Sequence, residues 1–337
     1  MGRLAWRPDP VLLLGRESRW RWPWVLAGMA AALLLFFALS FAPATFEEIA
    51  LGKGWIGDSF SSAVFPFEPT RPLSYLFDLL TWMPLLLPPL VVLRIVHGVS
   101  WRRAFSYGSG FRWLDFLRAA VALLVVLGLG AALTYLLEPQ QHEVRWPGLS
   151  VLPWIALGLG SIFVQTLAED IFFLGYLHRT WGAVLSYRLP VAALVTTVFI
   201  LGHLGNSDFQ RDILLAVVGF VIMTLISIAV LLRTQNLAAS AGLHWANNAF
   251  ILLRPGEPEE VSPLALVVYT DPVYAAGGSY LYDPTTWALA VAAPALLLLL
   301  LLWRRSPLYL AVPPVSGIGR SAPRAERAGP ASPVPSS

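Results

Sequence analysis

Residues 149–177 read LSVLPWIALGLGSIFVQTLAEDIFFLGYL, and this stretch decides the fold class. An apolar segment of roughly 20 residues is long enough to cross a bilayer as a helix. The stretch exceeds that length, and its charged residues are the neighbours Glu169 and Asp170. We therefore expect a transmembrane helix that carries two adjacent acids.

The composition of the whole chain supports a membrane protein. Of its 337 residues, 57% are hydrophobic and only 13% are charged, whereas about 25% of the residues of soluble domains are charged. Polar groups this scarce cannot cover a globular surface, so membrane lipid must be part of the solvent. The chain has no cysteine, which excludes disulfides, thiolate zinc sites and cysteine nucleophiles. A formal net charge of +3 is too small to indicate a nucleic-acid partner.

The hydropathy pattern predicts an all-α fold, a polytopic transmembrane helical bundle of about eight spans. The segment Tyr75–Val96 contains Pro84, Pro88 and Pro89 and is expected to be kinked or broken. The predicted spans are Trp22–Phe41, Tyr75–Val96, Leu114–Leu137, Leu149–Leu177, Pro190–Leu204, Asp212–Leu232, Leu237–Leu253 and Thr286–Trp303.

The arginines predict the orientation, because segments on the cytoplasmic side of a membrane are enriched in Lys and Arg. With both the N- and C-termini cytoplasmic, most arginines fall on the cytoplasmic side. The other side receives Lys53, Arg71, Arg145, Arg211 and Arg254. The first span, followed by Ala42-Pro43-Ala44, also resembles a cleaved signal peptide, but its length favours a retained helix.

We divide the chain into four parts. Residues 1–148 hold three membrane helices with their loops, and residues 149–253 form a catalytic helical core. Residues 254–305 hold an outer loop and the last span, and this loop is either a lid or a plain connection. Residues 306–337 are rich in Pro, Ala, Ser and Gly and are expected to be a disordered cytoplasmic tail.

Ionisable residues at membrane depth are functional candidates, because burying a charge in lipid is costly. Glu169 and Asp170 lie about 15 Å from the inner surface, His203 about 20 Å and His244 about 16 Å, at 1.5 Å per helical residue. Asn248 lies one turn beyond His244 on the same helix face. Other ionisable residues are weaker candidates for a functional site. Asp78, Asp115 and His178 are expected at the membrane interface, and His97 and His142 are expected in loops.

These residues at one depth fit either a polar network that joins helices or a site that activates water. A carboxylate in an apolar site can act as a general base. Two histidines can bind zinc or polarise a carbonyl, and an asparagine can donate to an oxyanion. We favour hydrolysis of an amide or ester within the bilayer.

Three local sequences resemble one known family, the CAAX protease and bacteriocin-processing (CPBP, or Abi) intramembrane proteases. Glu169-Asp170-Ile171-Phe172-Phe173-Leu174-Gly175 is similar to its Glu-Glu-x-x-x-Arg-Gly motif. Phe199-Ile200-Leu201-Gly202-His203 matches its Phe-x-x-x-His motif, and His244-Trp245-Ala246-Asn247-Asn248 matches its His-x-x-x-Asn motif. Their order also fits, and the resemblance covers residues 149–253.

The resemblance implies a membrane-embedded endopeptidase, either a metalloprotease or a glutamate-dependent protease. Glu169 would activate water, and Asp170 would support and orient it. His203, His244 and Asn248 would bind metal or stabilise the oxyanion, with a divalent metal such as zinc on the two histidines. The partners would be membrane lipid and a membrane-associated peptide or protein substrate. The location would be the bacterial cytoplasmic (inner) membrane.

Two departures from the family pattern leave alternatives open. Asp170 stands in place of a second Glu, and Leu174 stands in place of the arginine. Without that arginine, at least one of the two adjacent acids is expected to be protonated. A non-catalytic membrane scaffold of the same family is therefore one alternative. A transporter is another, although the sequence shows no paired repeat of broken helices.

Overall fold

The computed structural model describes the part of the chain that contains the predicted site. The described residues are 22–53, 83–106, 110–137, 139–145, 148–185, 187–206, 209, 212–253, 266–269 and 284–310. Most of them are helical, as predicted. The helices are α2 (Trp22–Gly52), α4 (Met83–Ile95), α5 (Trp113–Leu137), α6 (Leu152–Asp170), α7 (His178–Leu185), α8 (Arg188–Gly202), α10 (Ile213–Thr234), α11 (Ala238–Leu253) and α13 (Pro284–Leu302), with the π-helix η6 (Ile171–Leu177) and 3-10 turns η3 (Trp101–Ala104), η4 (Pro139–Gln141) and η5 (Leu149–Val151).

Among the described residues, three helical stretches are long and apolar enough to cross a membrane. They are Trp113–Leu137, Leu149–Gly182 and Ile213–Thr234. Shorter apolar helices cover Pro23–Leu39, Pro84–Ile95, Arg188–Gly202 and Ala292–Leu302. The protein is therefore an integral membrane protein, whereas the count of about eight spans and the cytoplasmic termini stay predictions.

The predicted second span differs from the structure. Residues 75–82 lie outside the described residues, and α4 begins at Met83. The helix contains Pro88 and Pro89 without interruption, so no break occurs there. Each proline lacks an N–H and so removes one hydrogen bond from the helix, yet the neighbouring turns keep it continuous.

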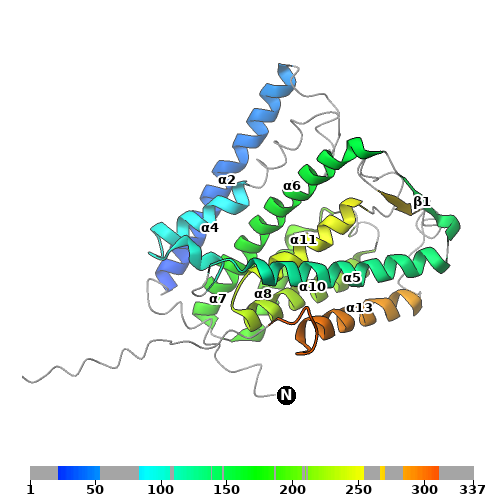
Figure 1. Ribbon diagram of the computed structural model, residues 1–337. Coiled ribbons are helices and arrows are strands. Elements are labelled where there is room, and N and C mark those ends of the chain that lie inside the picture. Colours follow the sequence, from blue (N-terminus) through cyan, green and yellow to red (C-terminus); the bar gives the residue numbers. More distant parts are fainter. Residues whose placement is uncertain are drawn as a thin grey trace, which may run out of the picture.

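Helix α11 occupies the centre of the bundle (Figure 1). It packs against α5, α6 and α10, whereas α2 and α4 pack together at one flank. One hydrophobic cluster joins α2, α4, η6, α8 and α10. A second cluster joins α5, α10, α11 and α13. The site residues on α6 and α11 therefore belong to helices that are packed on several sides.

Two glycines permit the closest approaches between segments. A Cβ on Gly242 of α11 would collide with the carbonyl oxygen of Phe116 on α5. A Cβ on Gly175 of η6 would lie 2.8 Å from the carbonyl oxygen of Ala104. Because real Cβ atoms do not approach a carbonyl this closely, both contacts require glycine.

A short two-stranded sheet lies outside the bundle. The sequence predicted an all-α fold and did not predict this sheet. Strands β1 (His142–Val144) and β2 (Val267–Tyr269) pair antiparallel. Valine and tyrosine favour strands, which explains why these loop residues pair. Beside β1, Arg145 donates to both oxygens of Glu143, and this hydrogen bond lowers the pKa of Glu143. Of the predicted outer loop, the described residues are those around β2.

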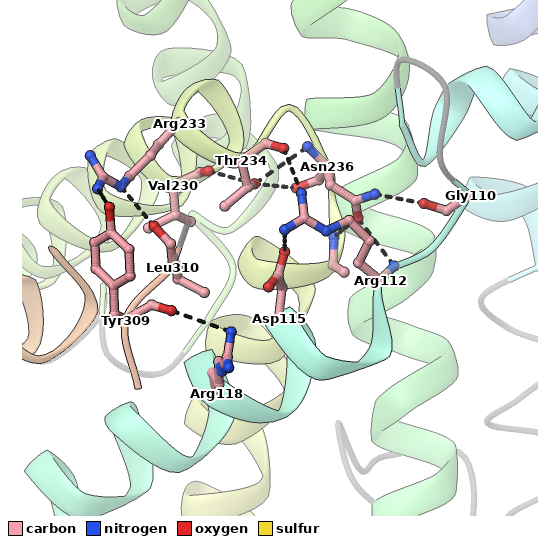
Figure 2. Close-up of polar contacts among 11 residues, drawn as sticks. Gly110, Arg112, Asp115, Arg118, Val230, Arg233, Thr234, Asn236, Tyr309 and Leu310 are labelled. Atoms are coloured by element: carbon pink, nitrogen blue, oxygen red, sulfur yellow. Dashed lines mark hydrogen bonds and ion pairs between the residues drawn. The ribbon is translucent and has the colours of Figure 1, made fainter. Parts of the chain in front are cut away.

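The first residues of the predicted tail are held against the bundle (Figure 2). Arg233 donates to the carbonyl oxygen of Leu310 at 3.0 Å and to the Tyr309 hydroxyl at 2.9 Å. Arg118 donates to the carbonyl oxygen of Tyr309 at 3.4 Å, and Leu310 is fully buried. The segment 306–310 is thus packed on α10 and α5, and residues 311–337 lie outside the described residues.

Asn236 joins the turn before α11 to the start of α5 (Figure 2). Its Nδ2 donates to the carbonyl oxygen of Gly110 at 2.6 Å. Its Oδ1 accepts from the N–H of Ala238 at 2.9 Å and from that of Arg112 at 3.4 Å. Arg112 also pairs with Asp115 at 2.6 Å. Asp115 is therefore buried in an ion pair within the protein, and its expected position at the membrane interface stays a prediction.

Candidate active site

The two acids lie where the α-helix α6 changes into the π-helix η6. Glu169 and Asp170 are the last residues of α6, and both are buried. The N–H of His178 donates to the carbonyl oxygen of Phe173, five residues earlier, which is the π-helical pattern. Single π turns inside α-helices occur frequently at functional sites. The wider turn changes the direction of the side chains that follow the acids.

His203 comes from the end of α8, which stops at Gly202. Its Nδ1 lies 2.7 Å from the carbonyl oxygen of Phe199. A carbonyl oxygen only accepts, so Nδ1 carries the proton of the neutral ring, and Nε2 is left with its lone pair. That Nε2 lies 3.7 Å from Oε2 of Glu169.

His244 of α11 contacts both acids. Its Nδ1 lies 3.0 Å from Oδ1 of Asp170, and its Nε2 lies 3.6 Å from Oε2 of Glu169. With Asp170 ionised, Nδ1 donates to the carboxylate, as in the carboxylate–histidine pairs that fix a tautomer. The Asp170 carboxylate also accepts from the Ser240 hydroxyl at 3.2 Å.

The carboxylate of Glu169 is the point where the three segments meet. Its Oε1 accepts from Nε2 of Gln165, one turn earlier on α6, at 3.4 Å. Its Oε2 is buried and has no hydrogen-bond partner among the described residues, yet the Nε2 atoms of His203 and His244 both face it. A buried oxygen of this kind is costly unless a small molecule such as water satisfies it.

Asn248 is the predicted site residue for which the structure gives no contact with the acids or histidines. It lies one turn beyond His244 on α11 and is half-buried. Its Oδ1 accepts from Nδ2 of Asn247 at 3.1 Å. Because this contact uses the amide oxygen, the Nδ2 group is the end that can donate to a ligand.

Aromatic rings surround the histidine side of the site. The His203 ring lies 4.3 Å from that of Phe199 and 5.0 Å from that of Phe220, measured between centroids. Phe199 also contacts the rings of Phe173 and His244. These rings give the histidine side of the site an apolar surrounding, and electrostatic interactions are stronger in apolar surroundings than in water.

His203, His244 and Glu169 are the candidate metal ligands of the site. Two histidine nitrogens and one carboxylate oxygen are donors that zinc accepts. However, the described residues contain no group of three or more His, Asp or Glu side chains arranged to hold a metal ion. Metal binding by His203 and His244 therefore stays a prediction.

Leu174, at the position of the family arginine, is buried in the hydrophobic cluster of α2, α4, η6, α8 and α10. Hydrogen-bond donors reach Asp170 instead from α11, through Ser240 and His244. Sequence reasoning missed Ser240 and also Gln165, which donates to Glu169. Both stand four residues before a predicted site residue, and this i, i+4 spacing on a helix face was the signal that could have found them.

Two other histidines are more deeply buried than the sequence indicated. His178, expected at the membrane interface, is buried inside the protein, and neither ring nitrogen has a hydrogen-bond partner in the described part of the chain. His97, expected in a loop without signal, is fully buried, and its Nε2 lies 3.5 Å from the Tyr176 hydroxyl. Both belong to the packing of α4 and α7 against η6.

The segment that contains the site is similar to known proteins. Residues 151–250 match the family described as type II CAAX prenyl endopeptidase Rce1-like. The chain is 20% identical over 164 residues to the uncharacterized protein YyaK of Bacillus subtilis (strain 168). These aligned residues make up 48% of this chain and 55% of that protein. The chain thus spans about half the length of this curated relative, and no solved structure matches significantly. Residues 151–250, which include the predicted site residues, are therefore similar to the Rce1-like family, and the predicted resemblance to the CPBP intramembrane proteases is confirmed for this segment.

Proposed function

We propose that this protein is an intramembrane endopeptidase that hydrolyses a peptide bond in a membrane-associated protein or peptide. One observation carries the proposal: the buried Oε2 of Glu169 is faced by Nε2 of His203 at 3.7 Å and by Nε2 of His244 at 3.6 Å. The match of residues 151–250 to an endopeptidase family supports the reaction class.

The protonation pattern favours a water molecule between these atoms. In the neutral tautomers, Nδ1 of each histidine carries the proton, so Oε2 and both Nε2 atoms are acceptors. Three acceptors that face one another require a donor between them, and water has two O–H groups. A water here would donate one O–H to Glu169 and the other to His203. The lone pairs of the water oxygen then point away from these two side chains.

In the first step, the water oxygen bonds to the carbonyl carbon of the substrate while Glu169 takes one of the water protons as general base. The C=O double bond becomes a single bond, and the carbonyl oxygen gains the negative charge. In the second step, the C–N bond breaks, and Glu169 returns the proton to the leaving nitrogen. The products are a new carboxyl end and a new amino end.

Asp170 orients His244, and Asn248 stabilises the oxyanion. The Asp170 carboxylate accepts from Nδ1 of His244 and so holds the neutral ring with Nε2 toward Glu169. The free amide end of Asn248 donates to the oxyanion. His203 and His244 remain the proposed ligands of a divalent metal such as zinc, which is the alternative to this scheme.

The substrate and the location are part of the proposal. The described membrane helices place Glu169 within a stretch that can cross the bilayer, so the scissile bond must reach membrane depth. A peptide that is itself inserted in or anchored to lipid can do so. We propose the bacterial cytoplasmic membrane as the location and both termini on its cytoplasmic side.

The test uses the full chain in proteoliposomes with a panel of lipid-anchored and membrane-spanning peptides, and mass spectrometry detects cleavage. Wild type should cleave at least one peptide, and His203→Ala should lose that activity. His142→Ala, on the outer strand β1, is the matched control and should keep it. If no variant cleaves any peptide but His203→Ala alters thermal stability or partner binding, the scaffold alternative holds. Solute flux without cleavage would indicate a transporter.

A further inference from the structure

Ser240 is a fully buried residue of α11, one turn before His244. Its Oγ donates to Oδ2 of Asp170 at 3.2 Å, while Nδ1 of His244 lies 3.0 Å from Oδ1 of the same carboxylate. Residues four apart on a helix share a face, so one face of α11 supplies a donor to each Asp170 oxygen. The carboxylate is thereby fixed against rotation about its Cβ–Cγ bond.

This arrangement supplies hydrogen-bond donors to Asp170 in the absence of the expected arginine. Glu169 and Asp170 are adjacent, buried acids, and the aliphatic Leu174 stands where a positively charged partner was expected. A buried carboxylate keeps its charge only when donors satisfy its oxygens. The Ser240 hydroxyl is one such donor, and it lies too deep to contact a substrate.

We propose that Ser240 is a positioning residue for the hydrolytic site. It holds the Asp170 carboxylate so that Oδ1 accepts from Nδ1 of His244, and this contact fixes the His244 tautomer with Nε2 toward Glu169. The role in catalysis rests on the proposed function, whereas the control of the His244 tautomer does not.

The kinetic test compares Ser240→Ala with a matched control. Thr166→Val removes another buried hydroxyl, one turn before Asp170 on α6, whose single O–H is shared between the backbone oxygens of Ile162 and Phe163. Loss of the partners that orient metal-ligating histidines typically costs about 10-fold to 100-fold in activity, and we expect a loss of the same order for His244. We expect Ser240→Ala to lower kcat by that factor with KM unchanged, while Thr166→Val keeps kcat within about twofold of wild type, a margin well below that loss.

The second measurement does not depend on activity. Nitrogen-15 NMR of histidine-labelled full-length protein in detergent reports which ring nitrogen of His244 is protonated, and the signal is assigned by its absence in His244→Gln. Wild type and Thr166→Val should show one tautomer, protonated at Nδ1, and Ser240→Ala should show a mixture.

Unchanged His244 signals in Ser240→Ala would overturn the positioning role, as would a kcat loss no larger than that of Thr166→Val. If the wild type cleaves no peptide, the proposed function fails, and the NMR comparison still decides the role of Ser240.

Discussion

Oε2 of Glu169 lies 3.6 Å from Nε2 of His244, and this contact joins the last turn of α6 to α11. The distance depends on how α11 is seated between α5, α6 and α10. Trp245 supports that position, since its indole N–H donates to the carbonyl oxygen of Leu159 on α6 at 3.0 Å. Changes that move α11 should therefore damage the site as well as the fold.

Gly242→Ala should destabilise the protein because the new Cβ would collide with the backbone oxygen of Phe116. Forcing extra atoms into a packed interior costs typically about 1–3 kcal/mol, and here the obstacle is backbone. We expect a lower thermal unfolding temperature in detergent and reduced peptide cleavage. Gly128→Ala on α5 is the control, since a Cβ there meets nothing within 4 Å. Equal unfolding temperatures for the two variants would contradict the close α5–α11 contact.

Asn236→Ala should loosen the start of α11. The change removes the donor to Gly110, a part-buried contact, and the acceptor for the N–H of Ala238, which is fully buried. Leaving buried polar groups unsatisfied costs about 1–3 kcal/mol. We expect a loss of unfolding free energy in that range by denaturant titration. The exposed Gln140→Ala should change it little, and a similar loss there would indicate a nonspecific effect.

Metal removal separates the two mechanisms proposed for His203 and His244. The scheme in which Glu169 activates water directly contains no metal step, so cleavage should persist after dialysis against a strong chelator. Elemental analysis of the same sample should find less than one zinc per chain. Activity lost to the chelator and restored by zinc alone would contradict that scheme and make the two histidines metal ligands.

The sequence predicted most of the helices that build the site. The span expected at Leu237–Leu253 is α11 at Ala238–Leu253, and the span expected at Asp212–Leu232 is α10 at Ile213–Thr234. Glu169 and His244 can be recognised in the sequence as candidates because polar groups within apolar membrane helices are rare and costly. The approximate depth arithmetic therefore brought the acids and both histidines together without knowledge of the packing.

Other features depend on three-dimensional packing and could not be predicted. The π-helix after Asp170 is a shift in backbone hydrogen bonding that no composition signals. The burial of His178 depends on how distant helices cover η6. The role of Ser240 depends on its contact with Asp170, which lies on another helix, so the local sequence around Ser240 does not reveal it. Whether Asn248 reaches the oxyanion stays a prediction.

The cleavage rate of Glu169→Gln tests the general-base role of Glu169. Glutamine keeps the size of the side chain and can still accept from Gln165, but it cannot take a proton from water. A general base typically contributes about 10²-fold to 10⁴-fold to the rate. We predict that the single-turnover rate in proteoliposomes falls by that factor, while the unfolding temperature stays near that of wild type. A Glu169→Gln variant that cleaves at the wild-type rate would show that Glu169 does not activate the water.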